Sequence, residues 1–248
     1  MKKCAVALLL ILCLLRSGWA VAADYQVLMA HDSNIYEENG VPLARLEAEF
    51  PQVTGLADAH AMNRVNAAIR DSVRLSGGYD GVCEVARGDY EAGMLSVPER
   101  MYGLTVCAEA AYENGRLLSV VYQYSADTGG VHPETWYGTG AYDLQTGETV
   151  ALELMVKDME AFRAQVADAV LTALEGSPLV KEGRLFDGYG DVVRAWRAEQ
   201  ILLGKDGLTV IFSPYQIAPY VEGMQKVTVS YDQLAGQWSD LGRMLIDK

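Results

Sequence analysis

The sequence predicts an α+β protein of two lobes, each an antiparallel sheet with packed helices. Short strand-like runs are separated by tight turns, and helix-like stretches are interspersed among them without strict alternation. That arrangement is typical of α+β folds and not of a doubly wound parallel sheet. The chain has 248 residues, and half of them are hydrophobic. This is enough to build one large domain or two small ones.

Residues 1–23 have the order of a secretory signal peptide. A basic start precedes an apolar run, Cys4–Leu15, and the small-residue stretch Ala20–Ala23. The apolar run is too short to cross a bilayer, which takes about 20 residues, and no second run of that length follows it. We therefore expect cleavage near residue 23 and a periplasmic or secreted protein. The alternative is an uncleaved amino-terminal anchor.

The amino-terminal lobe, residues 24–140, is expected to open with two strands and a helix. The strands span about residues 25–30 and 43–50. A polar loop, His31–Asn34, follows the first strand, while the second alternates apolar and charged residues until Pro51 ends it. The helix begins at Asp58, a favourable N-cap residue, and the glycines at 77–78 stop it.

The middle of the chain favours antiparallel sheet after an irregular stretch, residues 79–98, that we interpret as loop with one short strand near Cys83. Strands are expected at residues 102–112, 117–124, 136–144 and 149–154. Asn114–Gly115 joins the first two strands, because both residues tolerate the positive φ angles of a type I′ turn. Gly147 suits the left-handed position of the turn between the last two strands.

The carboxy-terminal lobe, residues 141–248, is expected to pack a helix on further strands. The helix spans about Asp158–Leu174, since apolar residues recur on one face and Gly176 and Pro178 follow. The remaining strands are expected at residues 198–203, 208–212 and 226–230. A final helix is expected to begin near Tyr231.

Two cysteines remain once Cys4 and Cys13 leave with the signal peptide. An even pair in an exported protein indicates a disulfide. We therefore predict a bond between Cys83 and Cys107. The alternative is two small side chains that never meet.

The chain is acidic, with a formal net charge of −13 that falls to −16 when Lys2, Lys3 and Arg16 leave with the signal peptide. A charge of this sign disfavours nucleic acid and anionic membrane surfaces, and it favours a basic partner. The simpler interpretation is that acidity keeps an exported protein in solution. The sequence carries no indication of the oligomeric state.

Three parts of the sequence resemble one known family. They are Phe50–Val53 with Asn63–Ile69, then Tyr122–Tyr124 with Gly129–Pro133, Tyr142–Leu144 and Thr146–Gly147, and finally Leu208–Phe212 with Pro214–Gly223. In this order they resemble the extracytoplasmic domain family of the lysozyme-sensing anti-sigma factor RsiV and of many exported bacterial proteins without assigned activity. The first half is also similar to the amino-terminal extension of the peptidoglycan deacetylase PdaC.

The resemblance implies an exported recognition domain, since this region of RsiV binds lysozyme. Only Met1–Lys3 precede the apolar run here, and no segment corresponds to the deacetylase catalytic domain. We therefore expect neither sigma-factor control nor deacetylation.

No catalytic or metal-binding motif stands out. The chain has three histidines, whereas a zinc site needs three or four closely arranged ligands. It contains no H-E-x-x-H, C-x-x-C, G-x-S-x-G or G-x-x-x-x-G-K sequence. We expect no metal, no cofactor and no catalytic residues.

The strongest candidate for a binding site is the loop from Asp127 to Glu134. Gly129-Gly130 permits unusual backbone angles, and Pro133 stiffens the exit of the loop. In an enzyme, His132 would be a general base oriented by Asp127 or Glu134. The simpler interpretation is that His132 bonds to backbone and holds the loop in shape, because no nucleophile or metal set accompanies it.

A second candidate is Pro214–Tyr220, where two prolines and two tyrosines follow a strand. Tyr215 and Tyr220 would offer contact area at a low cost in entropy. Alternatively, they form a buried corner with phenols bonded to backbone. We interpret the pair Glu47 and Glu49 as solvated, and Trp136-Tyr137 as sheet packing.

These observations favour a non-catalytic recognition protein of the bacterial cell envelope whose partner is lysozyme or another cell-wall-active protein. Two alternatives stay open: a hydrolase that acts on cell-wall glycan through the His132 loop, and a purely structural envelope protein. An apolar or aromatic cleft beside His132 would favour binding or catalysis over the structural role.

Overall fold

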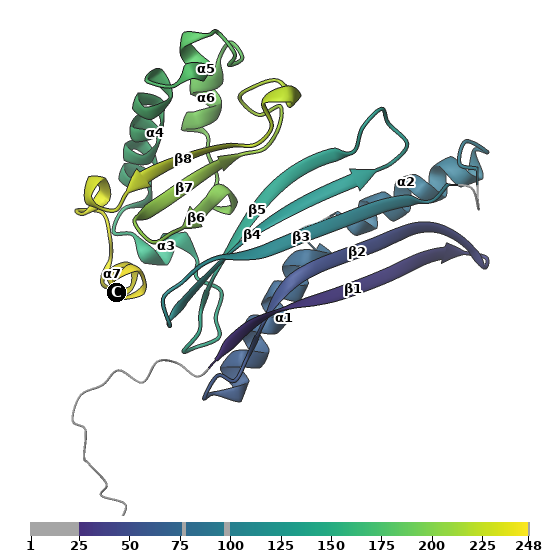
Figure 1. Cartoon of the computed structure of the whole chain (residues 1–248), viewed down its shortest axis with the longest axis horizontal. Helices are drawn as coiled ribbons and strands as arrows, with labels where there is room; N and C mark the ends of the chain where they lie inside the picture. The colour runs from purple at the N-terminus through teal and green to yellow at the C-terminus, as the bar shows by residue number, and fades with distance from the viewer. Residues whose placement is uncertain (1–24, 76–77, 97–99, 248) are drawn as a thin grey trace, which may run out of the picture.

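The computed structural model describes residues 25–75, 78–96 and 100–247. Its strands form two sheets, in the order β1-β2-β3-β4-β5 and β6-β7-β8, and helices pack against each sheet (Figure 1). The predicted α+β class is therefore confirmed. The predicted signal peptide, residues 1–23, lies outside the described residues.

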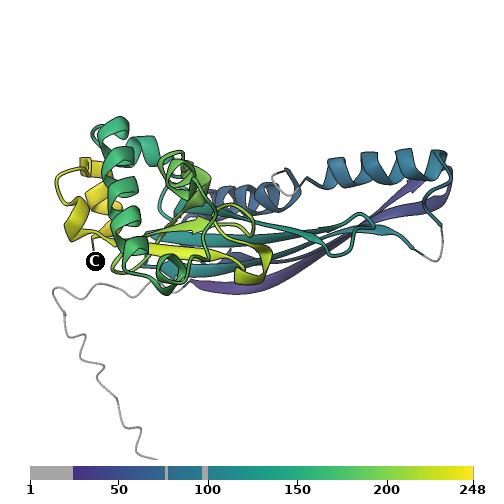
Figure 2. The same cartoon turned by 90° about the horizontal axis from the view of Figure 1, so that it is seen from above.

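The five-stranded sheet comes from the amino-terminal part of the chain. Its strands are β1 (Gln26–Glu38), β2 (Val41–Thr54), β3 (Tyr102–Glu113), β4 (Leu117–Asp127) and β5 (Glu134–Asp143). Neighbours are antiparallel, except that β2 and β3 are parallel. Parallel strands need a long crossover, and this crossover forms α1 (Ala59–Leu75) and α2 (Tyr79–Glu91), which run along one side of the sheet (Figure 2).

The face of this sheet that packs on α1 and α2, here called the covered face, holds the first hydrophobic core. Leu46 and Leu104 point into it and are at most 1% exposed, while the residues beside them in sequence point to the opposite, open face. Val65 of α1 packs into the same core. The Asn66 amide accepts a hydrogen bond from the Val53 N–H and donates one to the Val53 carbonyl, both at 2.8 Å, which ties α1 to β2.

The carboxy-terminal part forms the second sheet and a second core. The strands are β6 (Ile201–Leu203), β7 (Gly207–Phe212) and β8 (Gln225–Ser230), and the helices are α3 (Leu152–Met155), α4 (Met159–Glu175), α5 (Pro178–Lys181), α6 (Tyr189–Arg194) and α7 (Asp240–Ile246), with 3₁₀ turns η1 (Ala198–Gln200), η2 (Tyr220–Glu222) and η3 (Asp232–Leu234). The core surrounds Phe162, Trp196 and Trp238, whose rings meet edge to face. Asp158 caps α4.

None of the helices in the described part of the chain has the length and apolar character of a membrane span. The division of the two lobes at residue 140 stays a prediction.

The largest difference from the predicted elements is α2, because we expected loop over residues 79–98. Tyr79, Val82 and Ala86 recur at helical spacing and are buried against the sheet. Gly81 and Gly88 lie on the same helix and obscure this periodicity. Packing against β2 and β3 therefore outweighs the weak helix propensity of the segment.

Several strand boundaries also differ from the predicted ones. The expected loop His31–Asn34 is part of β1, where it pairs with the strand-forming residues of β2. Pro51 does not end β2, because it pairs with Met29 toward the end of the ladder. The expected strand at 149–154 is reduced to a single bridge at Thr149, followed by α3. The final helix begins only at Asp240, after the turn η3.

The turn between β3 and β4 is not type I′. Gly115 has a φ of 86°, but Asn114 is not among the residues with positive φ. Instead, the Asn114 side-chain oxygen accepts hydrogen bonds from the N–H groups of Arg116 and Leu117, at 3.1 and 2.8 Å. The turn is therefore held by an asparagine side chain that mimics backbone.

The predicted disulfide is wrong, because Cys83 and Cys107 are both free. Cys83 belongs to α2 and packs against the core of the covered face. Cys107 is an exposed residue of β3 that points to the open face. The sheet itself therefore separates the two thiols. Burial raises the pKa of Cys83, which keeps this thiol protonated.

Candidate functional site

The two segments that the sequence marked as candidate binding sites meet in space. The His132 ring stacks on the Tyr220 ring, with 4.3 Å between centroids and 20° between planes. Tyr215 completes the group at 6.4 Å from His132 and 5.5 Å from Tyr220. We call these three residues the aromatic cluster. The β4–β5 loop and the β7–β8 loop, one from each sheet, build it together.

The β4–β5 loop is held by the side chain of Asp127. The Asp127 carboxylate accepts a hydrogen bond from the Gly129 N–H at 3.0 Å and forms an ion pair with Arg100 at 3.1 Å. Gly129 has a φ of 93°, and a Cβ there would lie 3.2 Å from the Tyr102 hydroxyl. The backbone angle therefore favours glycine, and a Cβ would in addition press on the Tyr102 side chain.

His132 is bonded within the loop and not to a carboxylate. Its Nδ1 lies 3.0 Å from the Pro133 carbonyl, and its ring lies against Tyr220. Asp127 contacts Gly129 and Arg100, so it does not orient His132 as a catalytic pair requires. Gly130 adjoins this segment, where an added Cβ would lie 3.5 Å from the His132 carbonyl. These contacts fit a loop that holds the His132 ring at the surface.

Tyr215 has a φ of 68°, the left-handed region that bulky residues rarely occupy. Its side chain remains 57% exposed, so burial of the ring does not offset the cost of this conformation. Two valines beside the cluster are also exposed, Val131 at 104% and Val221 at 87%. The two loops therefore present aromatic and apolar side chains to solvent.

Tyr137 connects the aromatic cluster with a pocket on the open face. Its N–H donates to the Ser213 hydroxyl at 2.9 Å, and its own hydroxyl donates to the Gln123 side chain at 3.0 Å. Burial, followed by the neighbouring Tyr220, raises the pKa of the Tyr137 hydroxyl. Tyr137 thus lines the pocket and is near Tyr220 of the cluster.

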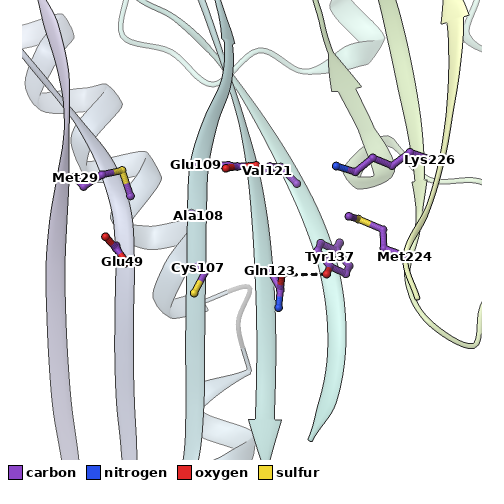
Figure 3. A pocket seen from close by; sticks show the side chains of 10 residues that line it. All are labelled: Met29, Glu49, Cys107, Ala108, Glu109, Val121, Gln123, Tyr137, Met224 and Lys226. Atoms are coloured by element: carbon purple, nitrogen blue, oxygen red, sulfur yellow. Dashed lines mark hydrogen bonds between the residues drawn. The ribbon is translucent and has the colours of Figure 1, made fainter. Parts of the chain in front are cut away.

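The open-face pocket has a volume of about 300 Å³ and is lined by side chains from both sheets (Figure 3). The residues are Met29, Glu49, Cys107, Ala108, Glu109, Val121, Gln123, Tyr137, Met224 and Lys226. Glu49 and Glu109 come from the five-stranded sheet, and Lys226 comes from β8. This mixture of apolar and charged lining residues suits recognition of a polypeptide surface.

Sequence reasoning missed most of this pocket. We interpreted Glu49 as solvated and Tyr137 as sheet packing, and the structure places both on the pocket. Trp136 does pack in the sheet, stacked on Tyr124 with 5.5 Å between centroids. The available signal was the outward position of Glu49, Cys107 and Gln123 on their strands. Their alignment across neighbouring strands depends on a register that the sequence does not specify.

No group of three or more histidine, cysteine or acidic side chains in residues 25–75, 78–96 and 100–247 is arranged to hold a metal ion. The two loops and the pocket present aromatic and amide groups together with charged ones. Such groups bind through contact area and hydrogen bonds.

Part of the chain matches a known family model, and its fold resembles two crystal structures. Residues 156–232 match the family model of DUF3298, described as a protein of unknown function. A DUF3298 family crystal structure from Bacteroides fragilis has a TM-score of 0.60 at 14% identity and covers 90% of this chain and 96% of its own. One from Pseudomonas aeruginosa has a TM-score of 0.57 at 16% identity and covers 87% and 94%. These likenesses show the fold alone, and no curated protein matches the chain.

Proposed function

We propose that this protein is an exported recognition protein that binds a basic, cell-wall-active protein such as lysozyme. The observation that carries the proposal is the aromatic cluster: His132, Tyr215 and Tyr220 come from two lobes and meet at the surface. Protein interfaces concentrate their binding energy in a few such rings, which combine large contact area with few rotatable bonds.

Charge supports the choice of a basic partner. The chain has a formal net charge of −13, and Glu49 and Glu109 face the single cation Lys226 around the open-face pocket. A negative surface steers a cationic protein toward it and raises the association rate. The resemblance of the sequence to the lysozyme-sensing domain family, together with the signal-like leader, supports lysozyme and export in particular.

The contacts of His132 favour recognition over hydrolysis. A hydrolase would use Asp127 or Glu134 to orient His132. Asp127 is instead held by Arg100 and Gly129, and the described contacts of the His132 ring are with the Pro133 carbonyl and the two tyrosines. A purely structural envelope protein has no need of the strained and exposed Tyr215. Both features find a use in a surface that binds a partner.

The proposal is tested by titration calorimetry of the purified protein against lysozyme at low and physiological salt. We expect binding that persists at physiological salt and weakens at least about ten-fold in Tyr220→Ala, because a ring at the centre of an interface is lost. Ile35→Ala is the matched control, since Ile35 is 51% exposed on β1 and belongs to neither the cluster nor the open-face pocket. Binding only at low salt would be charge attraction alone and would contradict the proposal.

Tyr215→Gly separates recognition from folding. Glycine adopts a positive φ at no steric cost, so the variant removes the ring and relieves the backbone at once. We expect the free energy of unfolding to be unchanged or higher while affinity for lysozyme falls. Unchanged affinity in this variant would exclude Tyr215 from the binding surface.

A further inference from the structure

A second cavity, the inter-lobe pocket, opens between the two sheets on the covered side. It has a volume of about 350 Å³, and the residues that line it include Tyr124, Trp136, Gly138, Arg197, Glu199 and Gln216. The covered side of β4 and β5 forms one wall. The turn η1 and the loop after β7 form the other wall. The pocket therefore exists only where the two lobes meet.

The cavity is left open by a glycine in a strand. Gly138 points to the covered side of β5, where an added Cβ would lie 3.4 Å from the Tyr124 ring. Its φ is not in the left-handed region, so the backbone conformation does not require glycine there. A larger residue at this position would fill the space beside Tyr124. Glycine in a strand interior otherwise weakens the strand, and it often marks a site where another molecule approaches closely.

The walls combine a flat apolar surface with planar polar groups. Trp136 is half-buried and stacks on Tyr124 at an interplanar angle of 17°. Opposite these rings lie the Gln216 amide and the exposed side chains of Arg197 and Glu199. Within the described residues, neither Arg197 nor Glu199 forms an ion pair. One cation and one anion leave the pocket without net charge, in a chain whose formal charge is −13.

We infer that the inter-lobe pocket binds a neutral saccharide. A sugar ring has an apolar C–H face that packs on an aromatic ring. Its hydroxyl groups can pair with the amide, guanidinium and carboxylate groups of the residues that line the pocket. The absence of net charge disfavours an anion or a cation by comparison. Glycoside hydrolysis needs two carboxyl groups across the bond, and Glu199 is the one carboxylate of this pocket. The inference is therefore of binding without cleavage, and it does not depend on the proposed partner protein.

Intrinsic fluorescence reports on this pocket directly. Trp196 and Trp238 are 1% and 2% exposed, whereas Trp136 is half-buried and lines the cavity. The purified protein is titrated with maltotetraose, cellotetraose and N-acetylchitotetraose up to about 10 mM, a range that covers weak binding. We expect a saturable change in tryptophan emission with at least one of the three sugars, and calorimetry of the same sugar should give the same affinity. No saturable response to any of them would overturn the inference.

Matched glycine variants locate the binding. Gly138→Leu fills the pocket and is expected to weaken saccharide binding at least about ten-fold. Gly103→Leu, on the open side of β3, is the control and should leave affinity within about two-fold. If Gly138→Leu does not fold, Gln216→Ala on the exposed rim serves instead, with the same direction expected. If a folded Gly138→Leu or Gln216→Ala protein bound the sugar as tightly as the parent, the sugar would bind elsewhere and the inference would be wrong. This outcome is independent of the result with lysozyme.

Discussion

The two faces of the five-stranded sheet differ in role, one forming a core and the other lining a pocket, although their residues alternate along the same strands. On β3, Leu104 is fully buried under the helices, while Thr105 and Cys107 are exposed on the open face. On β4, Tyr122 points into the core, and Gln123 lines the open-face pocket. Outside the inter-lobe pocket, close packing against the helices constrains the covered face, whereas the open face is free to be polar. Stability and recognition should therefore respond to different substitutions.

The largest expected effect is a difference in stability between substitutions at two neighbouring residues, one on each face of the sheet. Leu104→Ala should lower the free energy of unfolding by about 3 kcal/mol, because it removes a fully buried side chain and leaves a cavity. Thr105→Ala on the open face should change it by less than about 0.5 kcal/mol. Urea denaturation of both variants measures the contrast. Equal losses would show that the open face is also part of a packed core.

A second pair of variants tests how α1 is held against the covered face. Gly147 and Gly40 share a φ of 78°, but a Cβ at Gly147 would lie 2.5 Å from the Ala61 carbonyl of α1, while one at Gly40 meets nothing within 4 Å. Gly40→Ala should cost about 1 kcal/mol, the price of a left-handed alanine. Gly147→Ala should cost about 1–2 kcal/mol more, because the helix must shift. Similar melting temperatures for the two variants would mean that α1 tolerates displacement.

The covered face and α1 were largely predictable because burial imposes a period. Leu46 and Phe50 of β2 alternate with charged residues, and Val65 and Ile69 of α1 recur at helical spacing. α2 was not predictable in this way, because its glycines dilute a stripe of only three buried residues. Its helicity depends on contact with β2 and β3, which is tertiary information.

The candidate site was predictable only in pieces. Glycine, proline and tyrosine content marked both loops, but the stacking of His132 on Tyr220 depends on how the two sheets are placed. The error over Cys83 and Cys107 has a related cause. We expected a disulfide because exported proteins commonly contain them, but that reasoning does not show on which side of the sheet each cysteine lies. The sequence indicated the chemical character of each loop, but it did not indicate which distant residues lie together.

The smallest expected effect concerns the hydroxyl groups buried on the covered face. The Tyr122 and Tyr142 hydroxyls lie 2.6 Å apart, and burial raises the pKa of both. In the unfolded chain these groups ionise near pH 10, whereas in the folded protein they stay neutral. Their contribution is therefore complete below about pH 10, and it is lost as pH rises toward the folded-state pKa values.

Tyr122→Phe should accordingly lower the free energy of unfolding by about 1 kcal/mol at pH 8, where it leaves Tyr142 with a weaker partner, Ser72 at 3.3 Å. At pH 11 the parent protein loses about 1.4 kcal/mol for each such tyrosine, and the variant has one fewer, so the two stabilities should converge. Urea denaturation at both pH values measures this, with the exposed Tyr215→Phe as control. A constant gap between Tyr122→Phe and the parent would mean that Tyr122 ionises in the folded protein as easily as in the unfolded one, and that water reaches the covered face as it does the open face.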